Sequence, residues 1–168
     1  MSAERNVIVA GFPGVGKSTA SRQCRDWVDF ESSGFHWLSN GEENPKWPGN
    51  YIKAILDYDR DNVGKVVMIS THDVVVKAIA KHRPIVCVVP DEDLRNEYMI
   101  RYLRRGSPAA FIKTMAANWY DFIAGVSEPW AKGLCDYRNY GGDKGKLVNY
   151  TVIFLGSGQW LSDVLPRM

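Results

Sequence analysis

The sequence predicts a three-layer α/β protein in which a five-stranded parallel sheet lies between two layers of helices. Several short apolar runs are continuous instead of alternating, as is typical of strands that are buried on both faces. Helical segments separate these runs, and strands that alternate with helices form parallel sheets through right-handed crossovers. The 168 residues are 45% hydrophobic and 24% charged, which is ordinary for one globular domain with a substantial core.

The elements follow one another in a regular order along the chain. The predicted strands are 7–10, 27–31, 65–70, 84–89 and 150–155, and the predicted helices are about 18–26, 50–60, 73–81, 92–105 and 108–125. Gly106 ends one of these helices, and Ser107 with Pro108 supplies the N-cap and first turn of the next. The stretch from Gly133 to Gly145 is rich in glycine and charge, and we expect it to form a surface excursion.

A phosphate-binding motif follows the first strand. Residues 11–19 read GFPGVGKST and match G-x-x-x-x-G-K-[ST] at every required position. Between a strand and a helix, such a loop directs backbone N–H groups and the positive end of the helix toward phosphate oxygens. The residues expected to bind the nucleotide are Gly11, Pro13, Gly14, Val15, Gly16, Lys17, Ser18 and Thr19. Lys17 is expected to reach the β- and γ-phosphates and the Ser18 hydroxyl to bind Mg²⁺. The motif therefore predicts a three-layer P-loop NTPase fold.

Polar residues follow the second and third predicted strands, where the ligand crevice of an open α/β sheet lies. Asp29 is expected either to hold Mg²⁺, directly or through water, or to orient the acceptor; as the alternative, it is a solvated carboxylate at the sheet edge. After the third strand, Ser70 stands where a P-loop ATPase usually has an Asp that positions Mg²⁺, and Asp73 either serves this purpose or caps the next helix. His72 is expected to contact a phosphate of the substrate, or else to be structural or merely exposed.

Aromatic side chains flank the proline-rich loop 44–50. Trp37 and Tyr51 are candidates to stack on a base, as aromatic side chains do with unpaired bases, and Trp47 lies between them in the sequence. Ordinary hydrophobic cover is the alternative explanation.

Arginines gather in the predicted helix 92–105. Arg101, Arg104 and Arg105 are related by three and four residues and so share one helical face. Guanidinium groups can neutralise charge on a transferring phosphoryl group, so all three are candidate catalytic residues on a small helical lid at about 92–108. Glu97, four residues before Arg101, supports the alternative of a surface ion pair.

The P-loop resembles the G-x-P-G-x-G-K-x-T loop of nucleoside monophosphate kinases, among them adenylate kinase. Residues 97–107, 29–33 and 44–51 resemble small phage-encoded nucleotide kinases, so the likeness extends over most of residues 6–125. It implies transfer of the γ-phosphoryl group of ATP, with Mg²⁺, to a nucleoside or deoxynucleoside monophosphate. The Asp-Gly-Phe-Pro-Arg type motif of adenylate kinases is absent after the third strand, and the resemblance does not extend to residues 126–168. The identity of the acceptor therefore does not follow from the resemblance.

Composition restricts the partners and the compartment. The formal net charge is only +2, so a nucleic-acid partner is possible but not favoured. Residues 95–146 are the more basic part, with nine Lys/Arg against five Asp/Glu, which would suit a polynucleotide acceptor. A modified base or a small metabolite is a further alternative acceptor, and an ATPase without an acceptor is the remaining alternative. No apolar run is long enough to cross a bilayer and three scattered cysteines suggest reduced thiols, so we expect a cytoplasmic protein, in the host cytoplasm if it is phage-encoded.

Overall fold

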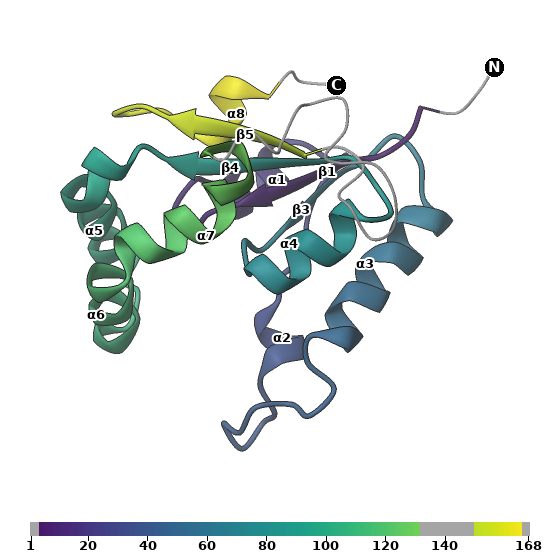
Figure 1. Cartoon of the computed structure of the whole chain (residues 1–168), viewed down its shortest axis with the longest axis horizontal. Helices are drawn as coiled ribbons and strands as arrows, with labels where there is room; N and C mark the ends of the chain where they lie inside the picture. Colours follow the sequence, from purple (N-terminus) through teal and green to yellow (C-terminus); the bar gives the residue numbers. More distant parts are fainter. Residues whose placement is uncertain (1–3, 132–149, 166–168) are drawn as a thin grey trace.

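A parallel five-stranded sheet forms the centre of the computed structural model, which describes residues 4–131 and 150–165 (Figure 1). The strand order is β2-β3-β1-β4-β5, and every pairing is parallel. The strands are β1 (Val7–Gly11), β2 (Trp27–Asp29), β3 (Val66–Ile69), β4 (Ile85–Pro90) and β5 (Tyr150–Leu155). The predicted fold class, an α/β protein with a five-stranded parallel sheet flanked by helices, is confirmed.

Helices cover both faces of the sheet. The short helices α1 (Lys17–Gln23) and α8 (Leu161–Val164) contact each other and lie on one face. On the other face α4 (Asp73–Ala80) contacts both α3 (Gly49–Asp61) and α7 (Trp119–Ala131). The fully buried strand β3 and the apolar centre of β4 account for much of the core between these layers.

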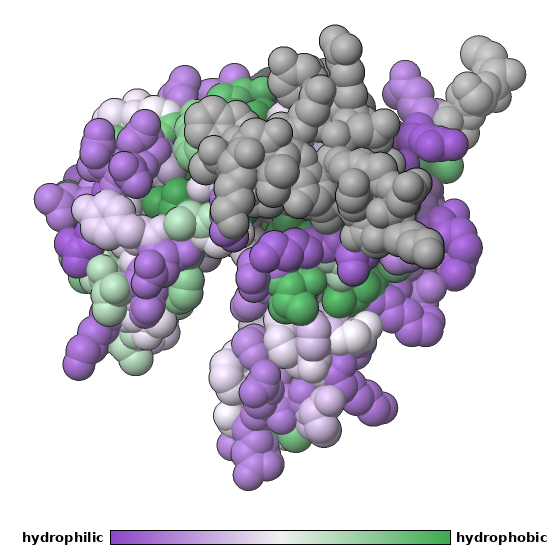
Figure 2. Space-filling model, viewed as in Figure 1, coloured by the Kyte–Doolittle hydropathy of each residue, from purple (hydrophilic) through white to green (hydrophobic). Residues whose placement is uncertain are grey.

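Two segments project from the carboxyl ends of the strands (Figure 1). One consists of α5 (Arg95–Arg104), preceded by a 3-10 turn at Glu92–Leu94, and α6 (Ala109–Ala117). The other contains α2 (Ser33–His36) and the loop up to α3. The space-filling view shows the molecule deeply indented between these two projections (Figure 2).

Several predicted boundaries were wrong. The predicted helix 108–125 is two helices that are separated at Asn118, because the chain turns there and places Trp119 in the core against Phe12, with ring centroids 5.4 Å apart. The helix predicted at 18–26 ends at Gln23, since Cys24 is already extended and leads into β2. The second strand ends at Asp29 instead of residue 31, and the short α2 and α8 were not predicted. The stretch from Gly133 to Gly145 lies outside the described residues.

Among the described residues, every helix is too short or too polar to cross a membrane.

Candidate active site

The loop between β1 and α1 has the backbone shape that its glycines allow. Gly14 and Gly16 have φ angles of +91° and +101°, a region that side-chain-bearing residues rarely adopt. Both also lack room for a side chain, because a Cβ on Gly14 would lie 2.9 Å from Tyr102 and one on Gly16 would lie 3.1 Å from Trp160. The glycine positions of the motif are thus required by conformation and by packing.

Three consecutive carbonyl groups of this loop accept hydrogen bonds from the surrounding scaffold. The Tyr102 hydroxyl donates to the Pro13 carbonyl at 2.7 Å, and Arg101 donates to that of Gly14 at 3.0 Å. The backbone N–H of Leu161 donates to the Val15 carbonyl at 2.8 Å. With its carbonyls fixed on the scaffold, the loop retains the N–H groups of Gly16, Lys17 and Ser18, which donate no hydrogen bond within the described part of the chain.

Lys17 lies across Gly11, where a Cβ would approach its aliphatic stem to 2.9 Å. Its ammonium group donates a hydrogen bond to the Gly11 carbonyl. Burial lowers the pKa of Lys17 from 10.5 to about 8, although the carboxylates of Asp29 and Glu31 oppose this change. The chain therefore holds a partly buried cation, whose charge is disfavoured by desolvation, beside the loop's unpaired N–H groups, and this arrangement is suited to an anion.

Asp29 lies beside the first turn of α1. Its Oδ2 accepts a hydrogen bond from Ser18 Oγ at 2.9 Å, which brings together the two residues predicted to bind Mg²⁺. The other oxygen, Oδ1, is buried and has no hydrogen-bond partner among the described residues. Hard oxygen donors of this kind fit Mg²⁺, which typically takes one or two protein ligands together with water and substrate phosphates.

The structure separates the three arginines of α5. The Arg101 guanidinium lies between the rings of Tyr98 and Trp160, at 4.4 and 3.8 Å, and also donates to the Gln159 carbonyl at 2.9 Å. The Arg101 side chain is only 10% exposed and donates to the Gly14 carbonyl, so in this structure it braces the P-loop, and its predicted catalytic role stays a prediction.

Arg104 and Arg105 are exposed. Arg105 donates to Ser107 Oγ at 2.7 Å and lies over the Tyr102 ring, and its charge contributes to lowering the pKa of Lys17. Arg104 forms no ion pair in the described regions. Arg104 and Arg105 are the more accessible of the three arginines that were predicted to neutralise a transferring phosphoryl group.

Aromatic rings form a stack on the opposite side of the site. His36 lies between Trp37 and Trp47, with centroid distances of 4.3 and 4.2 Å, and Trp47 in turn stacks on Tyr51. Trp37 ends the stack and is 50% exposed, so its ring is accessible to a flat ligand. Tyr51 is completely buried and donates to the Phe30 carbonyl, which corrects its prediction as a stacking residue. Burial also raises the pKa of Tyr51 to about 12.

His72 lies directly after β3, beside the loop that follows β1. Its Nδ1 is 2.8 Å from Ser70 Oγ, and its ring meets those of His36 and Trp47 edge to face. The helix after β1 and the helix after β3 cover opposite faces of the sheet, so the two neighbouring strands define a switch point, where ligands of open α/β sheets bind. Asp73 accepts the N–H of Val74, and neither Asp73 nor Ser70 contacts Ser18.

The segment that follows β5 contacts the site, although no motif in it predicted this. Glu97 accepts hydrogen bonds from Ser157 Oγ and the Gly158 N–H, at 2.6 and 3.2 Å, and so connects α5 to this segment. Trp160 then packs against Gly16. Some sixty residues separate these partners in the chain, so no local pattern could reveal them.

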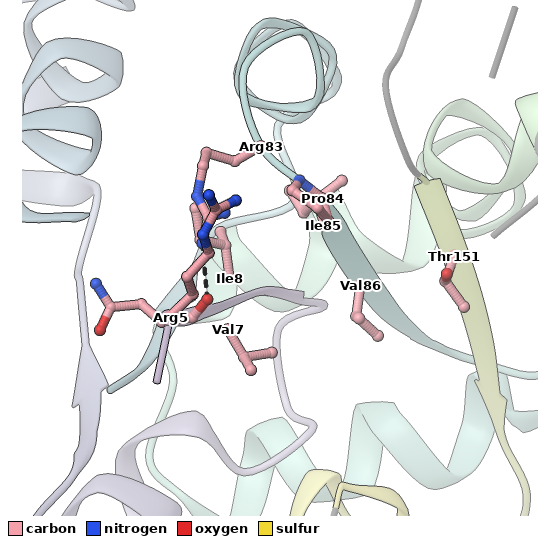
Figure 3. Close-up of a pocket in the computed structure, with 9 residues that line it drawn as sticks. Arg5, Val7, Ile8, Arg83, Pro84, Ile85, Val86 and Thr151 are labelled. Atoms are coloured by element: carbon pink, nitrogen blue, oxygen red, sulfur yellow. Dashed lines mark hydrogen bonds between the residues drawn. The ribbon is translucent and has the colours of Figure 1, made fainter. Parts of the chain in front are cut away.

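A pocket of about 370 Å³ lies at the opposite end of the sheet, where β1, β4 and β5 begin (Figure 3). Arg83 lines it but is engaged, since it donates to Asp59 at 2.8 Å and to the Asn6 carbonyl at 2.8 Å. The pocket contains none of the predicted site residues.

The chain is similar to known proteins at the level of solved structures. The chain matches no protein-family model and no curated protein. Among solved structures it is similar to the Deinococcus radiodurans tunicamycin resistance protein, with a TM-score of 0.47 and 14% identity over 73% of this chain and 80% of that one. At this identity the likeness concerns the arrangement of the backbone and not the chemistry of the site.

Proposed function

We propose that this protein is a P-loop phosphotransferase, which transfers the γ-phosphoryl group of ATP to a small acceptor. The observation that carries the proposal is the loop after β1: the carbonyls of Pro13, Gly14 and Val15 bond to the scaffold, while the N–H groups of Gly16, Lys17 and Ser18 stay unpaired within the described residues, next to the Lys17 side chain. Successive N–H groups and a lysine in a G-x-x-x-x-G-K-[ST] loop bind the phosphates of a nucleotide.

Phosphoryl transfer requires the protein mainly to position the reactants and to neutralise their charge. A transferring phosphoryl group distributes charge over its oxygens while the attacking and leaving oxygens lie in line. Lys17 would contact the β- and γ-phosphates, and Arg104 and Arg105 would approach from α5. Ser18 and Asp29 would hold Mg²⁺, which supplies charge neutralisation to the phosphates when bound.

Two acceptor classes are consistent with such a site. The first is a nucleoside or deoxynucleoside monophosphate, as the resemblance of the P-loop and of residues 97–107 implies. The second is a compound without a phosphate whose hydroxyl group accepts the phosphoryl group, because the carboxylates of Asp29 and Glu31 on the aromatic side of the site would repel a phosphate. A polynucleotide acceptor, and an ATPase without an acceptor, have less support from the contacts of the site.

The test is phosphoryl transfer from ATP with Mg²⁺, with products separated by chromatography, for the wild-type chain and Lys17→Ala. We expect Lys17→Ala to lower turnover ~10²-fold or more with the fold intact, because the lysine contacts the phosphates directly. Lys113→Ala is the matched control, since Lys113 is an exposed lysine on α6.

A near-normal rate in Lys17→Ala would overturn the proposal. Phosphate release that no acceptor changes would instead identify an ATPase. Tight, salt-sensitive binding of DNA or RNA would point to a polynucleotide acceptor.

A further inference from the structure

The side of the site that faces the P-loop from β2 and β3 is here called the acceptor wall. It consists of Asp29 and Glu31, the segment from His36 to Trp47, and Ser70 with His72. The ends of β2 and β3 lie side by side, because Asp29 pairs with Met68 in the sheet. The wall thus collects groups from three separate parts of the chain at the switch point of the sheet.

The acceptor wall is acidic. Residues 27–52 contain four carboxylates and a single lysine, Lys46. Asp73 pairs with Lys77 at 3.6 Å and so adds little net charge. The charges of Asp29 and Glu31 act on the site, since both raise the pKa of Lys17 and of Tyr51. A phosphate monoester carries a charge of about −1.5 to −2 at neutral pH and is repelled by such a surface.

Apart from Lys46, the cations of the site lie outside the acceptor wall. Lys17 lies under the P-loop, and Arg105 approaches it from α5, so both serve the phosphates of the donor. Lys46 is exposed and follows Asn44, whose side chain accepts its backbone N–H. The acceptor wall therefore suits a molecule without a phosphate.

His72 supplies what an uncharged acceptor needs. A phosphate acceptor is already a nucleophile, whereas a hydroxyl has to lose its proton as it attacks. Ser70 binds Nδ1 of His72 and orients the ring, while Nε2 forms no hydrogen bond with the described residues. The groups that face His72 are His36 of α2, Lys17 of α1 and Asp73 of α4; partial burial first, and then His36, lower its pKa below 6.5. The imidazole is thus uncharged at neutral pH and can accept a proton.

We propose that the acceptor is an uncharged compound with a flat ring and a hydroxyl group, of the nucleoside class, and that His72 is its general base. The ring would stack on the exposed face of Trp37, and Nε2 of His72 would take the hydroxyl proton. The acceptor oxygen forms a bond to the γ-phosphorus as the bond from that phosphorus to the β,γ-bridging oxygen breaks, and ADP leaves. His72 then releases the proton to water. This inference rests on the proposed function and specifies its acceptor.

The experiment compares matched pairs of acceptors on the full chain with MgATP. Each common ribo- and deoxynucleoside is assayed beside its own 5′-monophosphate, so that the two members of a pair differ only in the phosphate. We expect at least one nucleoside to be phosphorylated with a kcat/KM at least 10-fold above that of its monophosphate. Preference for the monophosphates, or transfer to neither set, overturns the inference.

A second measurement tests the base. His72→Gln should lower kcat for the nucleoside by ~10²-fold or more with little change in KM, and should remove the fall in rate toward acidic pH that protonation of His72 causes. His82→Gln is the control, because His82 is an exposed histidine at the other end of α4. An unchanged kcat and pH profile in His72→Gln overturns the role of His72.

The two proposals fail in different ways. If the chain does not bind MgATP, or if Lys17→Ala does not change turnover, the phosphotransferase proposal itself fails. If transfer depends on Lys17 but goes to monophosphates, only the acceptor inference fails.

Discussion

Replacing Lys17 by methionine should stabilise the ligand-free protein while it removes nucleotide binding. The fold lowers the pKa of Lys17 from 10.5 to about 8, chiefly through burial. A shift of this size corresponds to roughly 3 kcal/mol against the protonated side chain. Methionine keeps the apolar stem over Gly11 but loses the hydrogen bond to the Gly11 carbonyl, which contributes about 2 kcal/mol because the donor is charged. We therefore expect Lys17→Met to raise the free energy of unfolding by about 1 kcal/mol at pH 7.

The pH dependence has a definite sign. Below about pH 8 both the folded and the unfolded chain carry the proton on Lys17, so the whole cost of the buried charge is present. Between pH 8 and 10.5 the unfolded chain binds more protons, and the wild type becomes more stable as the pH rises. The advantage of Lys17→Met should therefore be largest below pH 8 and diminish toward pH 10.5.

Urea unfolding of the wild type, Lys17→Met and Lys113→Met measures this effect. The exposed Lys113 should change stability by no more than about 0.5 kcal/mol. Saturating MgATP, at about 100 times its Kd, should add roughly 2.7 kcal/mol to the wild type and nothing to Lys17→Met. A Lys17→Met protein that is less stable than the wild type at pH 7 would refute the reasoning.

Three further substitutions test the scaffold and the metal site. Gly14→Ala should lower the free energy of unfolding by about 3 kcal/mol, because φ is positive there and the new Cβ would contact Tyr102. Gly64→Ala is the control: φ is positive but no atom lies within 4 Å, so the loss should be about 1 kcal/mol. Equal losses in urea unfolding would contradict the packing argument. Arg83→Ala removes the ion pair with Asp59, whose partners are 17% and 12% exposed, and should lower the free energy of unfolding by about 3 kcal/mol. Lys53→Ala removes an exposed ion pair and should lower it by about 0.3 kcal/mol in the same urea measurement. Asp29→Asn should raise the Mg²⁺ concentration for half-maximal transfer roughly 10-fold or more, and an unchanged Mg²⁺ titration would exclude Asp29 from the metal site.

The fold class and the position of the P-loop follow from the order of residues along the chain. Continuous β-branched runs such as Val66–Ile69 can be buried only within a sheet covered on both faces, so the layers followed from composition and order. The P-loop was visible because all of its parts are consecutive in the chain, and its glycines stand where the backbone takes positive φ. Local patterns also placed Ser18 and Asp29 at the ends of neighbouring elements, which the structure brings to 2.9 Å.

Which side chains are exposed at the site, and which are held by neighbouring residues, depends on the packing of distant segments. Arg101 and Arg105 share a helical face and are equivalent in the sequence, yet Trp160 comes from a segment almost sixty residues later and encloses only Arg101. Tyr51 and Trp37 were likewise equal candidates until packing buried the one completely and left the other half exposed. Burial and hydrogen-bond partners depend on contacts between distant segments, and these contacts set the chemistry of individual residues in a way that no local pattern records.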